Sequence, residues 1–346
     1  GSSIILAETL KKIAPFVPVV LGGIHATIYT KKILEDNPSV DYIILGEGEY
    51  TFLELVKNLE NKKTNEIPLI DGIGYRAGDT AVVKEKKIFI GEEKEFGVEL
   101  DELTPVNFNL LNIEDYRFDT SNWYSPKKIG VGIPFPILSS RSCPLRCNFC
   151  SMWFVHGPKT RFRSADNVVD EIEYNYKNNG ARYFSFVDDN FTLSRKRILA
   201  ICRKILERGL DIQFDTPNGV MITTLDDEVV SAMVAAGLVK INLSPEHGSD
   251  HIRNIVIGKH LESEKIYEVF EACAKHDSLY IGAYFIFGLP EETPETLQET
   301  LDMVEKLPID RLSFSLATPY PGTQLYEYCV ENDLLEYDHE QSFDAS

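Results

Sequence analysis

The sequence predicts an α/β protein in which a partial (β/α)6 TIM-like barrel follows a fragment of a Rossmann-like domain. Strand-like and helix-like segments alternate along almost all of the 346 residues, which is typical of parallel sheets covered by helices. The second half holds six strand–helix units, fewer than the eight of a closed barrel. With 43% hydrophobic residues, the chain can fill the cores of about two domains.

The Rossmann-like fragment is expected over residues 1–69. Hydrophobic patterning there predicts alternating helices and buried strands over Ala7–Ile13, Val17–Leu21, Thr30–Leu34, Tyr42–Leu45 and Thr51–Leu59. Only two of these segments are strands, whereas a doubly wound sheet normally has five or six. We therefore expect the first half of this domain to lie before residue 1.

Residues 70–130 are expected to form a β-hairpin and a linker. Ile70–Ile90 alternates around the turn Ala77-Gly78-Asp79, and Glu92–Lys128 is acidic and punctuated by Pro and Asn. Residues 326–346 are expected to be an acidic C-terminal extension, because no Lys or Arg follows Glu331.

The barrel is expected over residues 131–325. Its predicted strands are Phe135–Ser139, Tyr183–Val187, Ile212–Thr216, Val239–Leu243, Tyr280–Phe287 and Arg311–Ala317. Its predicted helices are Val168–Asn178, Lys196–Glu207, Asp226–Ala236, Glu264–His276 and Pro294–Lys306. In such a layout, the chemistry belongs at the carboxyl ends of the strands.

Charge and composition exclude several classes of protein. The 54 acidic and 35 basic residues give a formal net charge of −19, which repels phosphate backbones and makes nucleic acid an unlikely partner. No apolar run approaches the roughly 20 residues needed to cross a bilayer, and the chain does not begin with a secretory signal. We expect a cytoplasmic protein with no membrane span. Six cysteines are too few for a disulfide framework.

Three of the cysteines lie within eight positions, directly after the first barrel strand. Cys143, Cys147 and Cys150 have the spacing C-x3-C-x2-C. A compact loop with three thiolates can bind three irons of a cubic iron–sulfur cluster and leave the fourth iron open. A zinc site would need a fourth ligand, for which His156 is the nearby candidate. Ordinary buried cysteines are a third interpretation.

These cysteines, with aromatic Phe149 before the third, resemble the signature of the radical S-adenosylmethionine (SAM) superfamily. The resemblance covers about Pro134–Pro321. It implies a [4Fe–4S] cluster on the three thiolates, with SAM chelated by the open iron through its amino and carboxylate groups. One electron would then cleave SAM to methionine and a 5′-deoxyadenosyl radical, which abstracts hydrogen from the substrate.

The same resemblance suggests further cofactor-binding residues at the strand ends. Asp189 and Asn190 follow the second barrel strand, where relatives place groups that receive the SAM amino group, although Asp and Asn also favour plain turns. Glu246 follows the fourth strand and is a candidate for the ribose or methionine end of SAM. Arg253 and Lys259 come next and are candidates for the SAM carboxylate, although each is more often a solvated surface charge.

The end of the fifth strand resembles the glycine-centred adenine-contact motif of the family. Its first glycine is replaced by Tyr284, so that only Ile286, Gly288 and Glu291 match. A glycine there lets the backbone approach a flat ring, whereas the alternative is a plain turn between a strand and a helix.

In the N-terminal fragment, Gly22 and Gly23 follow a buried strand, and a second glycine-rich turn begins at Gly46. Together they resemble the second half of the cobalamin (B12) binding domain of one radical SAM subgroup, where the glycine pair lines the groove for the nucleotide tail. The Asp-x-His-x-x-Gly element that supplies the lower axial histidine is absent from this sequence. Cobalamin is therefore a candidate cofactor of the full-length protein only.

The leading hypothesis is a radical SAM enzyme with a cobalamin-binding domain that acts on a small or medium organic substrate. It would need a low-potential electron donor such as flavodoxin or ferredoxin. A radical SAM enzyme that does without cobalamin is the second hypothesis, and a non-catalytic zinc-stabilised binding protein is the third. Aromatic residues expected to line a substrate pocket at the barrel rim are Tyr124, Trp153, Tyr284 and Tyr320.

Overall fold

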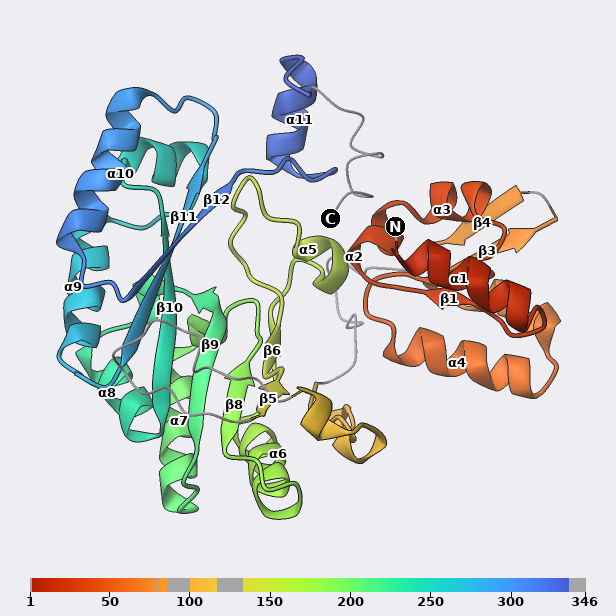
Figure 1. Ribbon diagram of the computed structural model, residues 1–346, viewed down its shortest axis with the longest axis horizontal. Helices are drawn as coiled ribbons and strands as arrows, with labels where there is room; N and C mark the ends of the chain where they lie inside the picture. The colour runs from red at the N-terminus through yellow and green to blue at the C-terminus, as the bar shows by residue number, and fades with distance from the viewer. Residues whose placement is uncertain (1, 79, 86–99, 117–132, 336–346) are drawn as a thin grey trace. The chain divides into compact units, whose positions relative to one another are not determined.

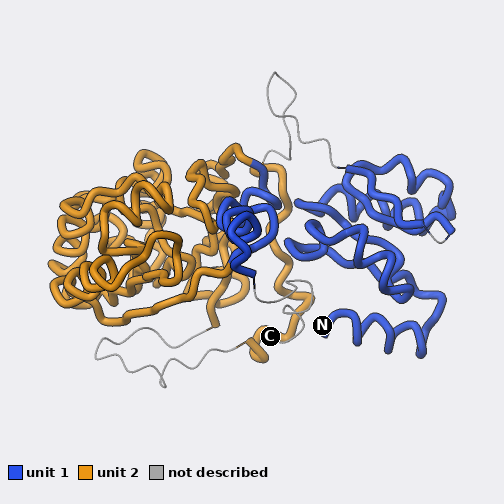
Figure 2. The backbone as a smooth tube through the Cα atoms, turned by 90° about the horizontal axis from the view of Figure 1, so that it is seen from above, with its two compact units in different colours: residues 1–97, 151–157, 319–346 blue, residues 98–150, 158–318 orange. Residues whose placement is uncertain are grey.

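The computed structural model describes residues 2–78, 80–85, 100–116 and 133–335. The chain divides into two compact units, coloured separately in Figure 2. The first unit consists of residues 1–97, 151–157 and 319–346, and the second of residues 98–150 and 158–318.

The first unit is built on a four-stranded sheet with the order β1-β2-β3-β4 (Figure 1). Strands β1 and β2 are parallel, and β2, β3 and β4 are antiparallel neighbours. Ile43 and Leu34 are fully buried in its core. Its elements are α1 (Ser2–Ile13), β1 (Val20–Leu21), α2 (Ile24–Ile28), α3 (Thr30–Asp36), β2 (Tyr42–Ile44), α4 (Glu49–Glu60), η1 (Thr64–Leu69), β3 (Ile73–Ala77), β4 (Thr80–Lys84), α5 (Trp153–His156) and α11 (Gln324–Glu331).

The hairpin of β3 and β4 turns where the sequence predicts, at Ala77 and Gly78, but it is not part of a linker. Tyr75 pairs with Tyr42 and Ile73 with Ile44, so the hairpin extends the N-terminal sheet. Ile73 is buried in the same cluster as Ile44 and Leu55, and this burial explains why the pairing forms. The boundary expected at residue 69 therefore falls inside this sheet. Asp79 and most of the expected linker lie outside the described residues, as do residues 336–346.

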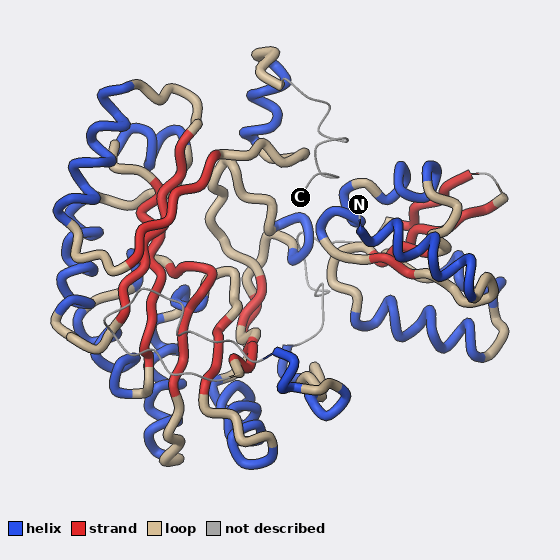
Figure 3. The backbone as a smooth tube through the Cα atoms, viewed as in Figure 1, coloured by secondary structure: helices blue, strands red, loops and turns tan. Residues whose placement is uncertain are grey.

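The second unit contains the predicted partial barrel, a six-stranded sheet with the order β12-β11-β10-β9-β8-β5. All neighbouring strands are parallel, and Figure 3 shows them side by side. A short antiparallel pair, β6 with β7, follows the first strand. The strands are β5 (Pro134–Ile137), β6 (Ser140–Arg141), β7 (Arg161–Phe162), β8 (Tyr183–Phe186), β9 (Gln213–Val220), β10 (Leu238–Glu246), β11 (Tyr280–Phe287) and β12 (Arg311–Leu316).

The helices between these strands pack on one face of the sheet. They bury alternate apolar strand residues such as Phe184, Phe214 and Ile241, while the intervening residues, among them Asp215 and Lys240, occupy the opposite face. The helices are α6 (Ala165–Asn178), α7 (Arg195–Glu207), α8 (Asp227–Ala235), α9 (Ser263–Ala274) and α10 (Pro294–Lys306), with a short π-helix at Ile252–Val256. Further single turns are η2 (Leu100–Glu102), η3 (Phe108–Leu110), η4 (Ile113–Tyr116), η6 (Phe191–Leu193) and η7 (Ile222–Thr224).

Two helix starts follow the signals in the sequence. The Ser164 hydroxyl accepts the Asn167 N–H at the start of α6, and Thr293 forms a capping box with Thr296 ahead of Pro294 in α10. Among the described residues, no helix is both long and apolar enough to span a membrane.

Candidate active site

The cysteine loop, residues 142–150, follows β6 at the carboxyl edge of the barrel sheet. Ser142 adopts a φ of 71°, a left-handed conformation that turns the chain out of the strand. Its N–H donates to Asp189 Oδ2 at 2.8 Å, which ties the start of the loop to the end of β8. Within the loop, the Cys150 N–H donates to the Cys147 carbonyl at 3.0 Å.

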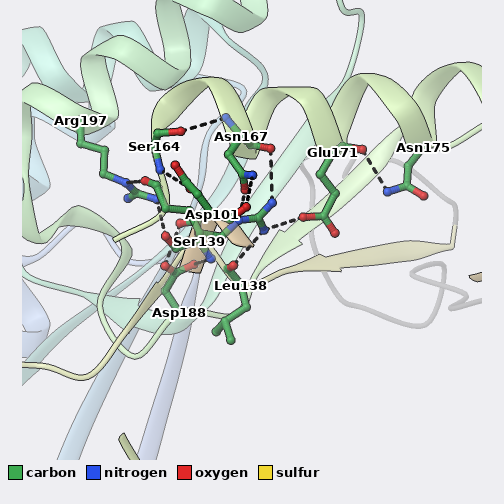
Figure 4. A network of polar contacts seen from close by, with 10 residues as sticks. Asp101, Leu138, Ser139, Ser164, Asn167, Glu171, Asn175, Asp188 and Arg197 are labelled. Carbon is green, nitrogen blue, oxygen red and sulfur yellow. Dashed lines mark hydrogen bonds and ion pairs between the residues drawn. The ribbon is translucent and has the colours of Figure 1, made fainter. Parts of the chain in front are cut away.

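A buried carboxylate holds the two strand ends that carry this loop (Figure 4). Asp188 accepts the Ser139 N–H at 3.2 Å and the Ser139 hydroxyl at 2.7 Å, and it also accepts the Ser140 hydroxyl. Arg197 Nη2 donates to the Ser139 carbonyl at 2.7 Å. Burial raises the pKa of Asp188, and the two hydroxyls oppose that shift. This carboxylate has a scaffolding role, and its neighbour Asp189 contacts the loop itself.

The other two thiols of the loop act electrostatically on Cys147. Burial raises the pKa of Cys147 to about 12; the Lys259 ammonium lowers it, and Glu246, Cys150 and Cys143 raise it. A thiol in such a place needs a metal to ionise it at neutral pH. In the parts of the chain that the structure describes, no group of three or more His, Cys, Asp or Glu side chains is placed to hold a single metal ion. Three thiolates match the ligands of a cubane with one open iron, whereas a structural zinc takes four ligands, so the donor set fits a cluster better.

Asn190 faces the same loop. Its Nδ2 donates to Cys143 Sγ over 3.7 Å, while its Oδ1 accepts the Met221 N–H at 3.1 Å. Asn190 and Asp189, both predicted for the SAM amino group, are thus brought to the cysteine loop. In the structure they hold the loop and one of its sulfurs.

Glu246 and Lys259 form a buried ion pair beside the thiols, with Lys259 Nζ 2.5 Å from Glu246 Oε1. Their side chains are 9% and 12% exposed, so the pair is shielded from water. Burial opposes the charge of Lys259, but Glu246 and then Cys147 outweigh it, and the pKa of Lys259 lies above its ordinary value. The sequence analysis singled out both residues without pairing them.

Arg253 is buried within the loop between β10 and α9. Its side chain is fully buried, and all five of its donors are used within the chain. Nε donates to the Leu261 carbonyl at 2.6 Å, Nη1 to two loop carbonyls, and Nη2 to Asp250 and the Ser263 hydroxyl. Arg253 therefore shapes the loop between β10 and α9, which contains Lys259 and follows Glu246, while its contact with SAM stays a prediction.

Phe149 and Ile286 meet in one small apolar cluster. They pack with Cys147 against Ile252, Ile257 and Leu289, which come from the loops after β10 and β11. The Asn148 N–H also donates to the Ile257 carbonyl at 3.0 Å. Phe149 therefore anchors the cysteine loop to the neighbouring loops through packing.

The turn after β11 contains the predicted Gly288 and Glu291. Gly288 has a φ of 80°, and its N–H donates to Glu292 Oε2 at 2.8 Å. Glu291 is largely exposed and pairs with His251 Nε2 at 2.7 Å, away from the buried cluster.

Sequence reasoning missed Glu292 and its buried neighbour His247. His247 Nδ1 accepts the Ser249 N–H at 3.0 Å, and Nε2 lies 3.5 Å from Glu292 Oε1. These contacts join the loops after β10 and β11. Neither residue carries a local signal that distinguishes it from a loop residue, so a tertiary contact was needed to find it.

In the first unit, the predicted glycine pair lies beside the second glycine turn. The Thr27 hydroxyl donates to the Gly23 carbonyl at 2.8 Å and accepts the Gly46 N–H at 3.0 Å. Gly23 has a φ of 93°, and a Cβ added there would meet nothing within 4 Å. The backbone is therefore open to a ligand at this point, which fits the tail of a cobalamin.

His156, the candidate fourth zinc ligand, has another partner. Its Nδ1 lies 2.9 Å from Oε1 of the buried Glu47. Of the residues expected to line a pocket, Tyr284 donates its hydroxyl to the Pro217 carbonyl at 2.8 Å in the second unit. Trp153 stacks on Phe154, and Tyr320 is partly exposed, both in the first unit. Tyr124 lies outside the described residues.

Two family models match the chain. The model described as the radical SAM superfamily matches residues 137–304, and that of the B12 binding domain matches residues 3–56. The first match contains the cysteine loop and β8 to β11, and the second contains the glycine pair.

Curated relatives cover nearly the whole chain. An uncharacterized methyltransferase of Pyrococcus horikoshii is 32% identical over 331 residues, which are 95% of this chain and 67% of the relative. An anaerobic magnesium-protoporphyrin IX monomethyl ester cyclase of Cereibacter sphaeroides is 31% identical over 92% of this chain and 50% of its own length. The chain thus spans half to two thirds of these relatives.

Among solved structures, the radical SAM methyltransferase TsrM from Kitasatospora setae, with cobalamin and a [4Fe-4S] cluster bound, has the same fold. The TM-score is 0.73 at 20% identity, over 94% of this chain and 60% of TsrM. Fold, cysteine loop and relatives agree, and the chain belongs to the radical SAM superfamily, in the subgroup that carries a B12 binding domain ahead of the barrel.

Proposed function

We propose that this chain carries the catalytic core of an enzyme that cleaves SAM reductively and abstracts a hydrogen atom from a small or medium organic substrate, with cobalamin-dependent methyl transfer to that substrate. The observation that carries the proposal is the cysteine loop: three thiols at the carboxyl edge of a partial barrel, beside a buried Lys259–Glu246 pair.

When bound, a [4Fe–4S] cluster and SAM supply the 5′-deoxyadenosyl radical. The residues of the chain hold and shield the site. Cys143, Cys147 and Cys150 would ligate three irons, and the apolar cluster around Phe149 keeps water from one side of the loop. Gly288 leaves the backbone after β11 without a side chain, which suits contact with a flat ring. Gly22 and Gly23 would line the groove for the cobalamin tail.

The face of the sheet opposite the helices carries a buried polar pair near the amino ends of β9 and β10. Asp215 is 6% exposed, and its Oδ1 has no hydrogen-bond partner among the described residues. Burial raises its pKa, and hydroxyls of Ser185 and Tyr183 on β8 oppose the shift. Lys240 pairs with Asp215 in register, and burial lowers its pKa to about 8.

The names of the relatives indicate a class of reaction and do not identify a single reaction. Their names include a cytidylyl-2-hydroxyethylphosphonate methyltransferase of Streptomyces wedmorensis and the cyclase named above. Methyl transfer to an organic substrate belongs to the first proposal, and ring formation belongs to the second candidate.

A radical SAM enzyme that does not use cobalamin is the second candidate. Corrinoid absorption of the purified full-length protein distinguishes the two candidates. For either, we propose a cytoplasmic enzyme that takes electrons from a flavodoxin-like or ferredoxin-like donor.

The direct test is anaerobic incubation with SAM and a chemical reductant, followed by measurement of 5′-deoxyadenosine. Wild-type protein should bind about four iron and four sulfide per chain and release the nucleoside. Cys147→Ala should abolish the release, because one iron loses its ligand. Cys329→Ala on α11 changes a cysteine outside the loop and should retain it. One zinc without iron, or unchanged release by Cys147→Ala, would refute the assignment.

A further inference from the structure

Asn190 makes a specific contact with a cluster-binding sulfur. Its amide orientation is fixed, because Oδ1 accepts the Met221 N–H at 3.1 Å. With the oxygen engaged on one side, the amino group faces Cys143 Sγ, 3.7 Å away. Asn190 is only 5% exposed, so water does not compete for this hydrogen bond.

Lys259 and Glu246 place one positive and one negative charge beside the same thiols. Lys259 acts electrostatically on Cys147 and Cys143, and Glu246 acts on Cys147 with the opposite sign. Both side chains are held by the fold. The Lys259 N–H donates to the Arg253 carbonyl at 3.0 Å, and Glu246 ends β10 with a left-handed φ of 70°.

Reduction adds one electron to a cluster that three thiolates already make negative. A cation or an N–H donor at the sulfurs stabilises the added charge, whereas a carboxylate destabilises it. Because these groups are buried, solvent and salt screen them weakly. A cation held beside the thiols therefore favours the reduced state.

We propose that Lys259, Asn190 and Glu246 set the reduction potential of the cluster before SAM binds: Lys259 and Asn190 raise it, and Glu246 lowers it. They are positioning residues that act through the sulfurs. The inference rests on the proposed function, since it requires a cluster on the three cysteines.

The experiment is an anaerobic redox titration of the reconstituted holoenzyme without SAM, followed by electron paramagnetic resonance. Lys259→Met should make the midpoint potential more negative, and Glu246→Gln should make it more positive. We expect each to change the ratio of reduced to oxidised cluster at a fixed potential by about tenfold, which is about 59 mV for one electron. Asn190→Leu should also make the midpoint potential more negative, but by less than Lys259→Met does.

Matched variants separate charge from structure. Lys259→Arg keeps the cation and should restore most of the wild-type potential. Lys275→Met removes a lysine whose side chain is 61% exposed at the end of α9, and should leave the potential unchanged. If Lys259→Met assembles no cluster, Glu246→Gln and Lys259→Arg still test how the side-chain charge changes the midpoint potential.

The outcomes are distinct. Wild-type protein without iron refutes the proposed function itself. A normal cluster whose potential is the same in Lys259→Met and Glu246→Gln overturns this inference only. Shifts of the same sign in the two variants also overturn it, because disturbed packing and not charge would then explain them. Shifts that arise only after SAM is added would assign Lys259 to the SAM carboxylate and likewise overturn it.

Discussion

At the scale of single residues, His247 links stability to pH. It is fully buried, its Nδ1 accepts the Ser249 N–H, and burial together with the Arg253 charge lowers its pKa from 6.5 to about 4. As the pH falls, the His247 imidazole is therefore protonated in the unfolded chain before it is protonated in the folded chain. The contribution of His247 to stability is complete above about pH 6.5 and is lost progressively toward pH 4, by at most about 3 kcal/mol.

The check is urea unfolding at pH 7 and pH 5. Between pH 7 and pH 5, the free energy of unfolding should fall by roughly 2 kcal/mol more in wild-type protein than in His247→Gln, because the variant has no imidazole to protonate. His251→Gln, which changes an imidazole whose side chain is 53% exposed, serves as the matched control and should behave like wild type. Equal losses in wild type and His247→Gln would contradict the assignment of a buried neutral imidazole.

Residues with a local signal were predictable, and residues fixed by tertiary contacts were not. The cysteine spacing alone points to three thiols on one loop, because eight positions keep them close in any fold. Arg253 looked like a surface cation, since nothing in its neighbours reveals that five acceptors would surround it. The pairing of Glu246 with Lys259, 13 positions apart, likewise depends on how the loop after β10 folds back.

At the scale of elements, Gly282 in β11 is a position where a side chain has no room. A Cβ added to Gly282 in β11 would lie 2.1 Å from Asn242 Oδ1 in β10. The Asn242 amide donates to the Thr216 and Pro217 carbonyls, where β9 bulges between Thr216 and Val220. Gly282→Ala should therefore displace Asn242 and lower the free energy of unfolding by about 1–3 kcal/mol.

A double-mutant cycle in urea tests this steric cause. In an Asn242→Ala background, the cost of Gly282→Ala should fall, because the clashing amide is gone, giving a coupling of about 1 kcal/mol or more. Additive losses in the double variant would mean that the glycine is needed for another reason.

The strands and helices of the barrel followed from hydrophobic period and from capping residues, which act within a few positions. Thr293 with Pro294 marks the start of α10 in any context. The hairpin of β3 and β4 was recognised locally, but its membership in the N-terminal sheet depends on pairing with β2, some 30 positions earlier. That prediction was limited by the separation of β2 and the hairpin along the sequence, and not by a weak propensity of these residues to form strands.

At the scale of the whole molecule, the chain combines a radical SAM barrel with a B12-type unit, and its relatives are longer. Whether the two cofactors are used together is a property of the full-length protein. The glycine pair gives a way to test the B12 unit without assaying catalysis.

Gly23→Val in the full-length protein should abolish or severely weaken binding of cobalamin, measured by the absorption of bound corrinoid after gel filtration. At a φ of 93°, a β-branched residue is strained, and its side chain would enter the open space beside the backbone. Gly78→Val provides the matched control, because Gly78 has a φ of 63° at the hairpin turn of the same unit and a Cβ there also meets nothing within 4 Å. It carries a comparable strain away from the groove and should bind corrinoid like wild type. Equal loss in both variants would show that general destabilisation of the unit, and not occlusion of the groove, prevents binding; undiminished binding by Gly23→Val would remove the glycine pair from the cobalamin site.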